Sequence, residues 1–138
     1  MNKRVSVAAC GLGLLLLLAG LSGCGGGQAS LVDSGRIHLE SDAPGKVYVA
    51  WSDAQEEEGG FLVTGVLRRK DTVGPPIKAT VEVEIVSPCG SILDQAQSDD
   101  LYVPHRKVNR VQGFERFSVR FPKTPPDGSC VRIVARPS

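Results

Sequence analysis

The chain has 138 residues, of which 41% are hydrophobic, 16 are basic and 15 are acidic. This length favours one domain. The formal net charge of +1 provides no strongly basic face, so we expect no nucleic-acid partner.

The first 23 residues have the organisation of a removable export signal. Lys3 and Arg4 form a basic start, and an uncharged apolar run over 5–19 follows. The run is short for a membrane-spanning helix and glycines interrupt it, so it predicts a signal peptide. Removing Lys3 and Arg4 leaves 14 basic residues against 15 acidic ones, so the mature chain is nearly neutral.

The four residues Leu21-Ser22-Gly23-Cys24 sharpen this interpretation. They resemble the lipobox of bacterial lipoproteins, in which a branched apolar residue and two small residues precede a cysteine. The resemblance covers residues 1–24. It implies cleavage before Cys24, a diacylglycerol thioether on its thiol and, in many bacteria, an acyl group on its amine. We expect no other cofactor. The alternative is an uncleaved anchor helix with a chance cysteine.

The residues after Cys24 indicate where the chain is held and where its domain begins. In the sorting pattern of enterobacterial lipoproteins, Asp after the cysteine retains the protein on the inner membrane. Gly25 lacks that signal, so the resemblance implies the periplasmic face of the outer membrane if the source is Gram-negative. The glycine-rich stretch predicts a flexible tether over 24–34, followed by a domain over 35–138.

Alternation of apolar and polar residues with a period of two dominates the rest of the chain. No window shows a sustained helical period. The alternation predicts four strands with inward sets, and weaker candidates lie at 36–39, 48–51 and 91–97. The inward sets are Ile77, Ala79, Val81, Val83 and Ile85; Phe61, Val63, Gly65 and Leu67; Phe117, Val119 and Phe121; and Val131, Ile133 and Ala135.

Between these strands, clusters of Pro, Gly and Asp predict turns, and the run Glu56-Glu57-Glu58-Gly59-Gly60 predicts a solvated loop. Six or seven short strands predict an all-β fold, a small antiparallel β-sandwich. Their order over 46–137 resembles immunoglobulin-like and fibronectin type III-like domains. A seventh strand after the sixth is missing, so either N-terminal strands fill its place or a sheet edge is open.

The resemblance implies that strands 77–86 and 130–136 are antiparallel neighbours. The outward Glu82 and Glu84 would then face Arg132 and Arg136. Cys89 and Cys130, the two cysteines of the mature domain, would lie where these strands end and begin, and an oxidising compartment favours a disulfide between them. Two free thiols are the second interpretation, and a metal site with His38 or His105 is the third.

No catalytic constellation is visible, so we expect no enzyme and no metal ligands. Asp99-Asp100 falls in a polar stretch, and Tyr102 to Lys107 predicts a loop. The dense basic residues Arg106, Lys107, Arg110, Arg116 and Arg120 fit outward strand and loop positions; the alternative is a patch for anionic lipid, lipopolysaccharide or peptidoglycan carboxylates. Trp51 and Tyr48 could form an exposed aromatic platform, but we expect packing in the core or on a sheet face.

These observations predict a membrane-anchored, non-enzymatic binding or assembly module of the cell envelope, whose partner is an envelope protein. One alternative is a small-ligand or metal carrier or sensor that uses His38, His105 or Tyr102. Another is a hydrolase with an unrecognised site.

Overall fold

The computed structural model describes residues 29–71, 73–105 and 113–138. The signal segment, Cys24 and the basic residues Arg106, Lys107 and Arg110 lie outside these ranges. No helix long and apolar enough to cross a membrane is found in the described part of the chain. Eight strands occur in it: β1 (Ile37–Asp42), β2 (Val47–Glu57), β3 (Gly60–Arg69), β4 (Ile77–Val86), β5 (Ile92–Gln97), β6 (Leu101–Val103), β7 (Glu115–Phe121) and β8 (Ser129–Pro137).

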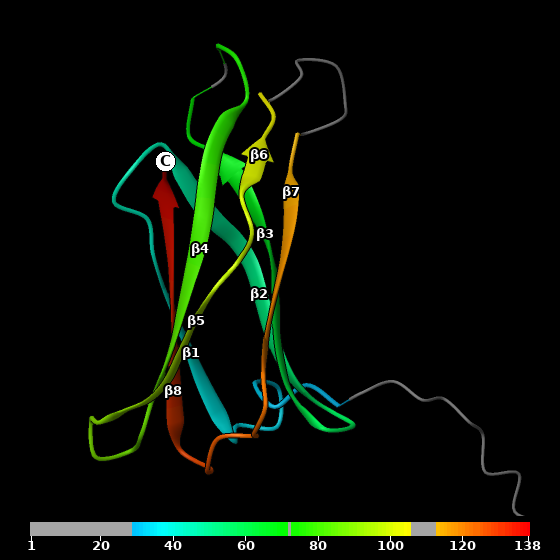
Figure 1. Cartoon of the computed structure of the whole chain (residues 1–138), viewed down its shortest axis with the longest axis vertical. Coiled ribbons are helices and arrows are strands. Elements are labelled where there is room, and N and C mark those ends of the chain that lie inside the picture. Colours follow the sequence, from blue (N-terminus) through cyan, green and yellow to red (C-terminus); the bar gives the residue numbers. More distant parts are fainter. Residues whose placement is uncertain (1–28, 72, 106–112) are drawn as a thin grey trace, which may run out of the picture.

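The strands form two sheets that pack face to face (Figure 1). One has the order β1-β8-β4-β5, with β6 also paired to β4, and the other has the order β2-β3-β7. This arrangement confirms the predicted all-β sandwich. Strands β4 and β8 are antiparallel neighbours, as expected. On their outer face, Arg132 lies 3.2 Å from Glu84 and Arg136 lies 2.9 Å from Glu82, which confirms both predicted pairs. Exposed cross-strand pairs of this kind contribute roughly 0.2–1 kcal/mol each.

The core lies between the inner faces of the two sheets. The residues buried there from β3, β4, β7 and β8 belong to the four predicted inward sets, because successive side chains of a strand point to opposite faces. Phe61 and Phe121, paired on β3 and β7, have ring centroids 6.1 Å apart. Burying one large aliphatic or aromatic side chain stabilises the fold by about 1.5–3 kcal/mol.

Strand β1 occupies the sheet edge that the sequence left undecided. It pairs in parallel with β8, from Ile37 opposite Ser129 to Asp42 opposite Val134. A strand from the N-terminal end therefore covers β8, and the sandwich is not purely antiparallel. Only Ile37 of β1 is buried, so this strand contributes backbone hydrogen bonds more than core volume.

Two expected loops are strands in part. Glu56 and Glu57 continue β2, which pairs with β3 up to Glu57 opposite Gly60. The turn therefore contains only Glu58 and Gly59, and Gly59 has φ 83°, a conformation that favours glycine. In the second case, Tyr102 and Val103 belong to the short strand β6. The period-two signal fails there because a three-residue strand between Asp100 and Pro104 is too short to show it.

The domain also begins earlier than predicted. Ser30 forms an isolated antiparallel bridge with Gln55, and the Leu31 amide donates to the Ala54 carbonyl at 2.8 Å. Leu31 is only 3% exposed and belongs to the core. Residues 30–34 are therefore part of the domain rather than of a free tether, because Leu31 needs burial that a tether does not supply.

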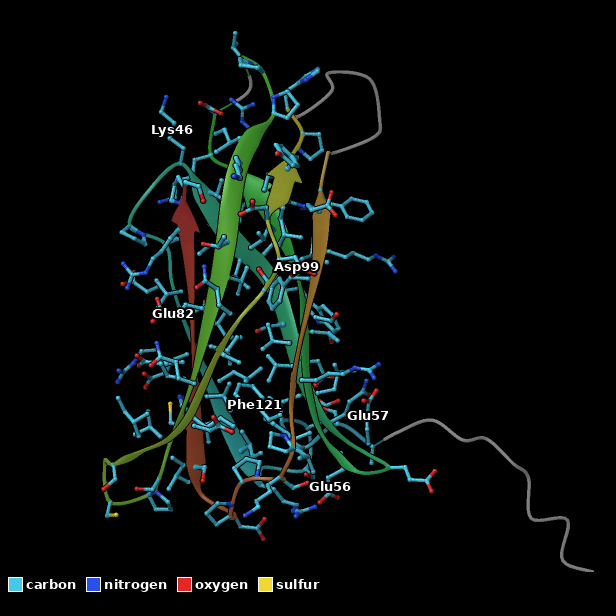
Figure 2. The ribbon with its side chains drawn as sticks, in the orientation of Figure 1. Lys46, Glu56, Glu57, Glu82, Asp99 and Phe121 are labelled. Atoms are coloured by element: carbon cyan, nitrogen blue, oxygen red, sulfur yellow. The ribbon has the colours of Figure 1, made fainter. Side chains whose placement is uncertain are left out.

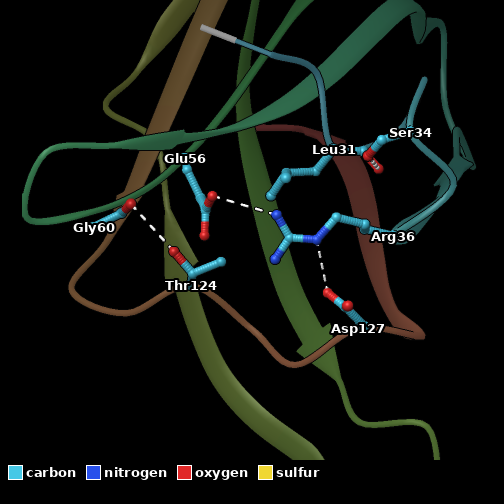
Figure 3. A network of polar contacts seen from close by, with 7 residues as sticks. All are labelled: Leu31, Ser34, Arg36, Glu56, Gly60, Thr124 and Asp127. Carbon is cyan, nitrogen blue, oxygen red and sulfur yellow. Dashed lines mark hydrogen bonds and ion pairs between the residues drawn. The ribbon is translucent and has the colours of Figure 1, made fainter.

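Arginines hold loops at both ends of the sandwich. At the end that carries the β2–β3 turn, Arg36 lies between Asp127, at 2.8 Å, and Glu56, at 3.4 Å (Figure 3). The hydrogen bond to Asp127 is the main cause that raises the pKa of Arg36. At the opposite end, the buried Arg69 donates to Asp71 and to the carbonyls of residues 73, 74 and 75. The β3–β4 connection is therefore built around one guanidinium.

A tight contact between β3 and β7 gives a stability prediction. A Cβ atom on Gly65 would lie 2.5 Å from two ring carbons of Phe117 and 2.6 Å from the Trp51 carbonyl oxygen. Gly65→Ala should therefore lower the free energy of unfolding by roughly 1–3 kcal/mol, as measured by urea denaturation. The exposed Ser118→Ala on β7 is the control and should change it by less than about 0.5 kcal/mol. A Gly65→Ala variant as stable as the wild type would show that this contact relaxes freely.

Candidate binding face

The outer face of sheet β2-β3-β7 gathers large aromatic side chains and arginines. In one cross-strand row, Tyr48 on β2 lies opposite Arg68 on β3. In the next, Trp51 lies opposite Val66, which lies opposite Arg116 on β7. Phe114 lies just before β7, and the Arg116 guanidinium carbon is 5.7 Å from its ring centroid, a cation–π contact. We call Tyr48, Trp51, Arg68, Phe114 and Arg116 the aromatic–arginine face.

A β-bulge brings both aromatic residues of β2 to this face. The pairing with β3 shifts between Val49 and Trp51, so Ala50 is an extra residue. In a regular strand, positions 48 and 51 would point to opposite faces, because the side-chain period is two. The bulge removes that difference, and Trp51 becomes 56% exposed. Of the two placements expected for Trp51, in the core or on a sheet face, the structure shows the sheet face, where Trp51 is exposed as in the alternative of an aromatic platform.

The aromatic–arginine face contains a groove of about 590 Å³. Trp51 and Arg116 line it together with Thr64, Val66 and Ser118 and with parts of Gly65 and Phe117. Its volume is in the range of ligand pockets, which are usually apolar with a few polar groups. Phe114, which contacts the lining residue Arg116, is 42% exposed. Apolar area of this kind on a surface is typical of a binding site.

The charges of this face are not neutralised. The structure describes seven arginines, and five of them, namely Arg36, Arg69, Arg120, Arg132 and Arg136, form ion pairs with carboxylates. The other two are Arg68 and Arg116. All Asp and Glu residues of the chain lie in the described ranges. The Nε atom of Arg68 is buried and has no hydrogen-bond acceptor in the described structure.

The two cysteines of the domain are free thiols, so the predicted disulfide is not formed in this structure. The strands run as expected, but Cys130 lies opposite Val86, at the end of β4. Cys89 lies three residues further along, in a turn where its Sγ contacts the Ser87 hydroxyl at 3.0 Å and the Ser91 hydroxyl at 3.8 Å. The turn therefore directs Cys89 to its own serines rather than to Cys130.

The surroundings of the two thiols shift their pKa values in opposite directions. Hydrogen bonds with Ser87, and then with Ser91, lower the pKa of Cys89. Partial burial, followed by the negative charge of Glu40, raises the pKa of Cys130. The reactive thiolate of Cys89 thus forms at lower pH than that of Cys130.

The other candidate residues are dispersed. His38 on β1 lies opposite Cys130, near the end of β4, whereas His105 follows β6, which pairs with the start of β4. The two histidines therefore do not share a site. Tyr102 is exposed on β6, and Asp100 pairs with Lys78 at 2.9 Å. Within the described ranges, no three His, Cys, Asp or Glu residues are placed to hold a metal ion.

A second, smaller groove of about 260 Å³ lies between β5 and the loop after β7. Leu93, Pro125 and Pro126 supply its apolar lining, and Lys123 and Asp94 lie at it as well. Leu93 and the adjacent Ile92 are exposed on the edge strand β5. This groove has no aromatic residue in its lining, unlike the first, which is therefore the stronger candidate.

Comparisons with known proteins add no assignment, since no protein-family model, curated protein or solved structure matches the chain. The candidate site consequently rests on the geometry of the aromatic–arginine face.

The two thiols give a prediction about reactivity. Iodoacetamide should alkylate both cysteines in protein purified without reductant, and Cys89 should react first. Because the pKa of Cys89 is lowered and that of Cys130 is raised, the alkylation rate of Cys89 should increase over a lower pH range than the alkylation rate of Cys130. Mass spectrometry of samples quenched over time measures both rates, and Cys89→Ser should leave only the slow adduct. Protection of both residues until a reductant is added would instead establish the disulfide.

Proposed function

We propose that this chain is a lipid-anchored protein of the bacterial envelope whose sandwich binds a protein partner through the aromatic–arginine face and catalyses no reaction. The observation that carries the binding role is that Trp51 and Arg116 line one groove on a sheet face that also bears Tyr48 and the exposed Phe114. Trp, Tyr and Arg are the residues that most often dominate the energy of protein interfaces. Aromatic side chains are expensive to expose, and a partner that covers them recovers that free energy.

The lipid anchor rests on the lipobox resemblance. Cleavage before Cys24 and acylation of that residue would hold the domain on a membrane, at the periplasmic face of the outer membrane if the source is Gram-negative. The chain enters the domain at Ser30, which pairs with Gln55 near the β2–β3 turn. Trp51 lies four residues away along β2, on the side of the sandwich. Anchoring from this end leaves the aromatic–arginine face accessible to a partner.

Lipidation is tested at Cys24. The Cys24→Ser variant has no thiol to receive the diacylglycerol, so cells fed a palmitate analogue should not label it, and it should leave the membrane fraction or accumulate uncleaved. Cys89→Ser is the matched control and should be labelled like the wild type. Equal labelling of Cys24→Ser and wild type would contradict the lipoprotein proposal.

Partner binding is tested by site-specific photo-crosslinking in intact cells. A photoreactive amino acid at Thr64 or Ser118, in the floor of the groove, should give one discrete adduct with a partner protein. Thr80, on the outer face of the other sheet, is the control position and should give none. Trp51→Ala should abolish the adduct while leaving the urea midpoint nearly unchanged, since Trp51 is exposed. Identical adducts from all three positions, or adducts that survive Trp51→Ala, would refute this face as the interface.

A further inference from the structure

The aromatic–arginine face carries two positive charges for which the chain supplies no counter-charge. The five other described arginines are paired, and even the exposed Arg120, on the same outer face, lies 3.7 Å from Glu57. Arg116 contacts the Phe114 ring, and an aromatic ring accepts none of the guanidinium N–H bonds in the way that a carboxylate does. Arg68 lies opposite Tyr48, and among the described residues none accepts a hydrogen bond from its Nε. Unsatisfied donors in partly buried sites favour an external acceptor.

The spacing of the two arginines suits one kind of acceptor. Arg116 pairs with Val66, and Arg68 is two residues from Val66 along β3, so the two arginines are diagonal neighbours. The Cα atoms of such diagonal neighbours are about 7–8 Å apart. Alternate residues of an extended peptide point to the same side and are roughly 7 Å apart, since the rise is about 3.3–3.4 Å per residue. Two residues at positions i and i+2 of an extended segment therefore have a backbone spacing close to that of Arg68 and Arg116.

We infer that the partner segment bound at this face is extended and acidic, with carboxylates at alternate positions that bind Arg68 and Arg116 while an apolar residue contacts Trp51 in the groove. The inference rests on the proposed binding role of the face and specifies the chemistry of its partner. Charge-assisted hydrogen bonds are roughly twice as strong as neutral ones, and arginine binds carboxylates with two parallel bonds. Aromatic neighbours that exclude water strengthen them further.

The same face argues against a flat anionic membrane as the occupant. A membrane surface attracts a broad basic patch, because each cation adds a similar small attraction. Here the neighbouring outward positions include Asp53, opposite Thr64, and Glu57, which already neutralises Arg120. The positive charge is therefore local and lies beside a groove, which suits a defined segment.

The test uses the full lipidated chain in detergent and a fluorescent peptide that has two glutamates separated by one valine and flanked by threonines. Fluorescence anisotropy should detect binding, and a peptide with glutamines in place of the glutamates should not bind. Arg68→Gln and Arg116→Gln should each weaken binding by roughly tenfold or more, because each removes one charge-assisted contact. Arg120→Gln is the matched control and should stay within about twofold. Arg116→Lys should bind more tightly than Arg116→Gln, because it keeps the charge.

Three results would overturn the inference. The first is equal binding of the glutamate and glutamine peptides, or no binding of either. The second is an equal loss of affinity in Arg120→Gln and Arg116→Gln. The third is tight binding to vesicles with anionic phospholipid that Arg68→Gln and Arg116→Gln weaken, in the absence of peptide binding. If only the acidic character of the partner segment is wrong, the crosslinks at Thr64 and Ser118 should still form. If no crosslinks form at these positions, the proposed binding role of the face is itself refuted. Urea denaturation of each variant verifies that it is folded.

Discussion

The structure depends on the two-residue side-chain period of four of its strands. Each of β3, β4, β7 and β8 places every second residue in a common core, and this burial stabilises the sandwich. The same period commits the remaining residues to the outer faces. On the β4–β8 side these are Glu82, Glu84, Arg132 and Arg136, which neutralise one another. On the β3–β7 side they include Arg68 and Arg116, which form no ion pair with a carboxylate in the described part of the chain. The difference between the two outer faces distinguishes a solvated surface from a candidate interface.

The two ends of the sandwich and the edge of β8 are held by contacts between segments far apart in the sequence. Strand β1 covers the edge of β8, and Arg36 joins the start of the domain to Glu56 and Asp127 (Figure 3). At the other end, Arg69 organises the connection to β4, near Lys46, which lies 3.7 Å from Asp71 (Figure 2). These contacts hold both ends of β2 and β3. A rigid sheet is a suitable support for a binding face, because little ordering free energy is then lost when a partner binds.

The candidate interface combines two structural features that depend on each other. The bulge at Ala50 aligns Trp51 with Tyr48, and the pairing of β3 with β7 places Arg116 beside the resulting groove. Aromatic residues supply apolar area for binding, and unpaired arginines orient the partner and select one of complementary charge. Under the proposed lipid anchor, this combination would hold a domain with one exposed binding surface close to a membrane, where partners are concentrated.

The sequence by itself determined the all-β class, the inward sets of the four main strands and the facing of Glu82 and Glu84 with Arg132 and Arg136. These features follow from local alternation, which is visible in any window of a strand. The tertiary structure decided the rest. Four features depend on which distant segments meet. They are the parallel pairing of β1 with β8, the strand β6, the burial of Leu31 and the separation of Cys89 from Cys130. The exposure of Trp51 also required the structure, because one extra residue in β2 reverses the side-chain parity, and that residue is recognisable only from its register against β3.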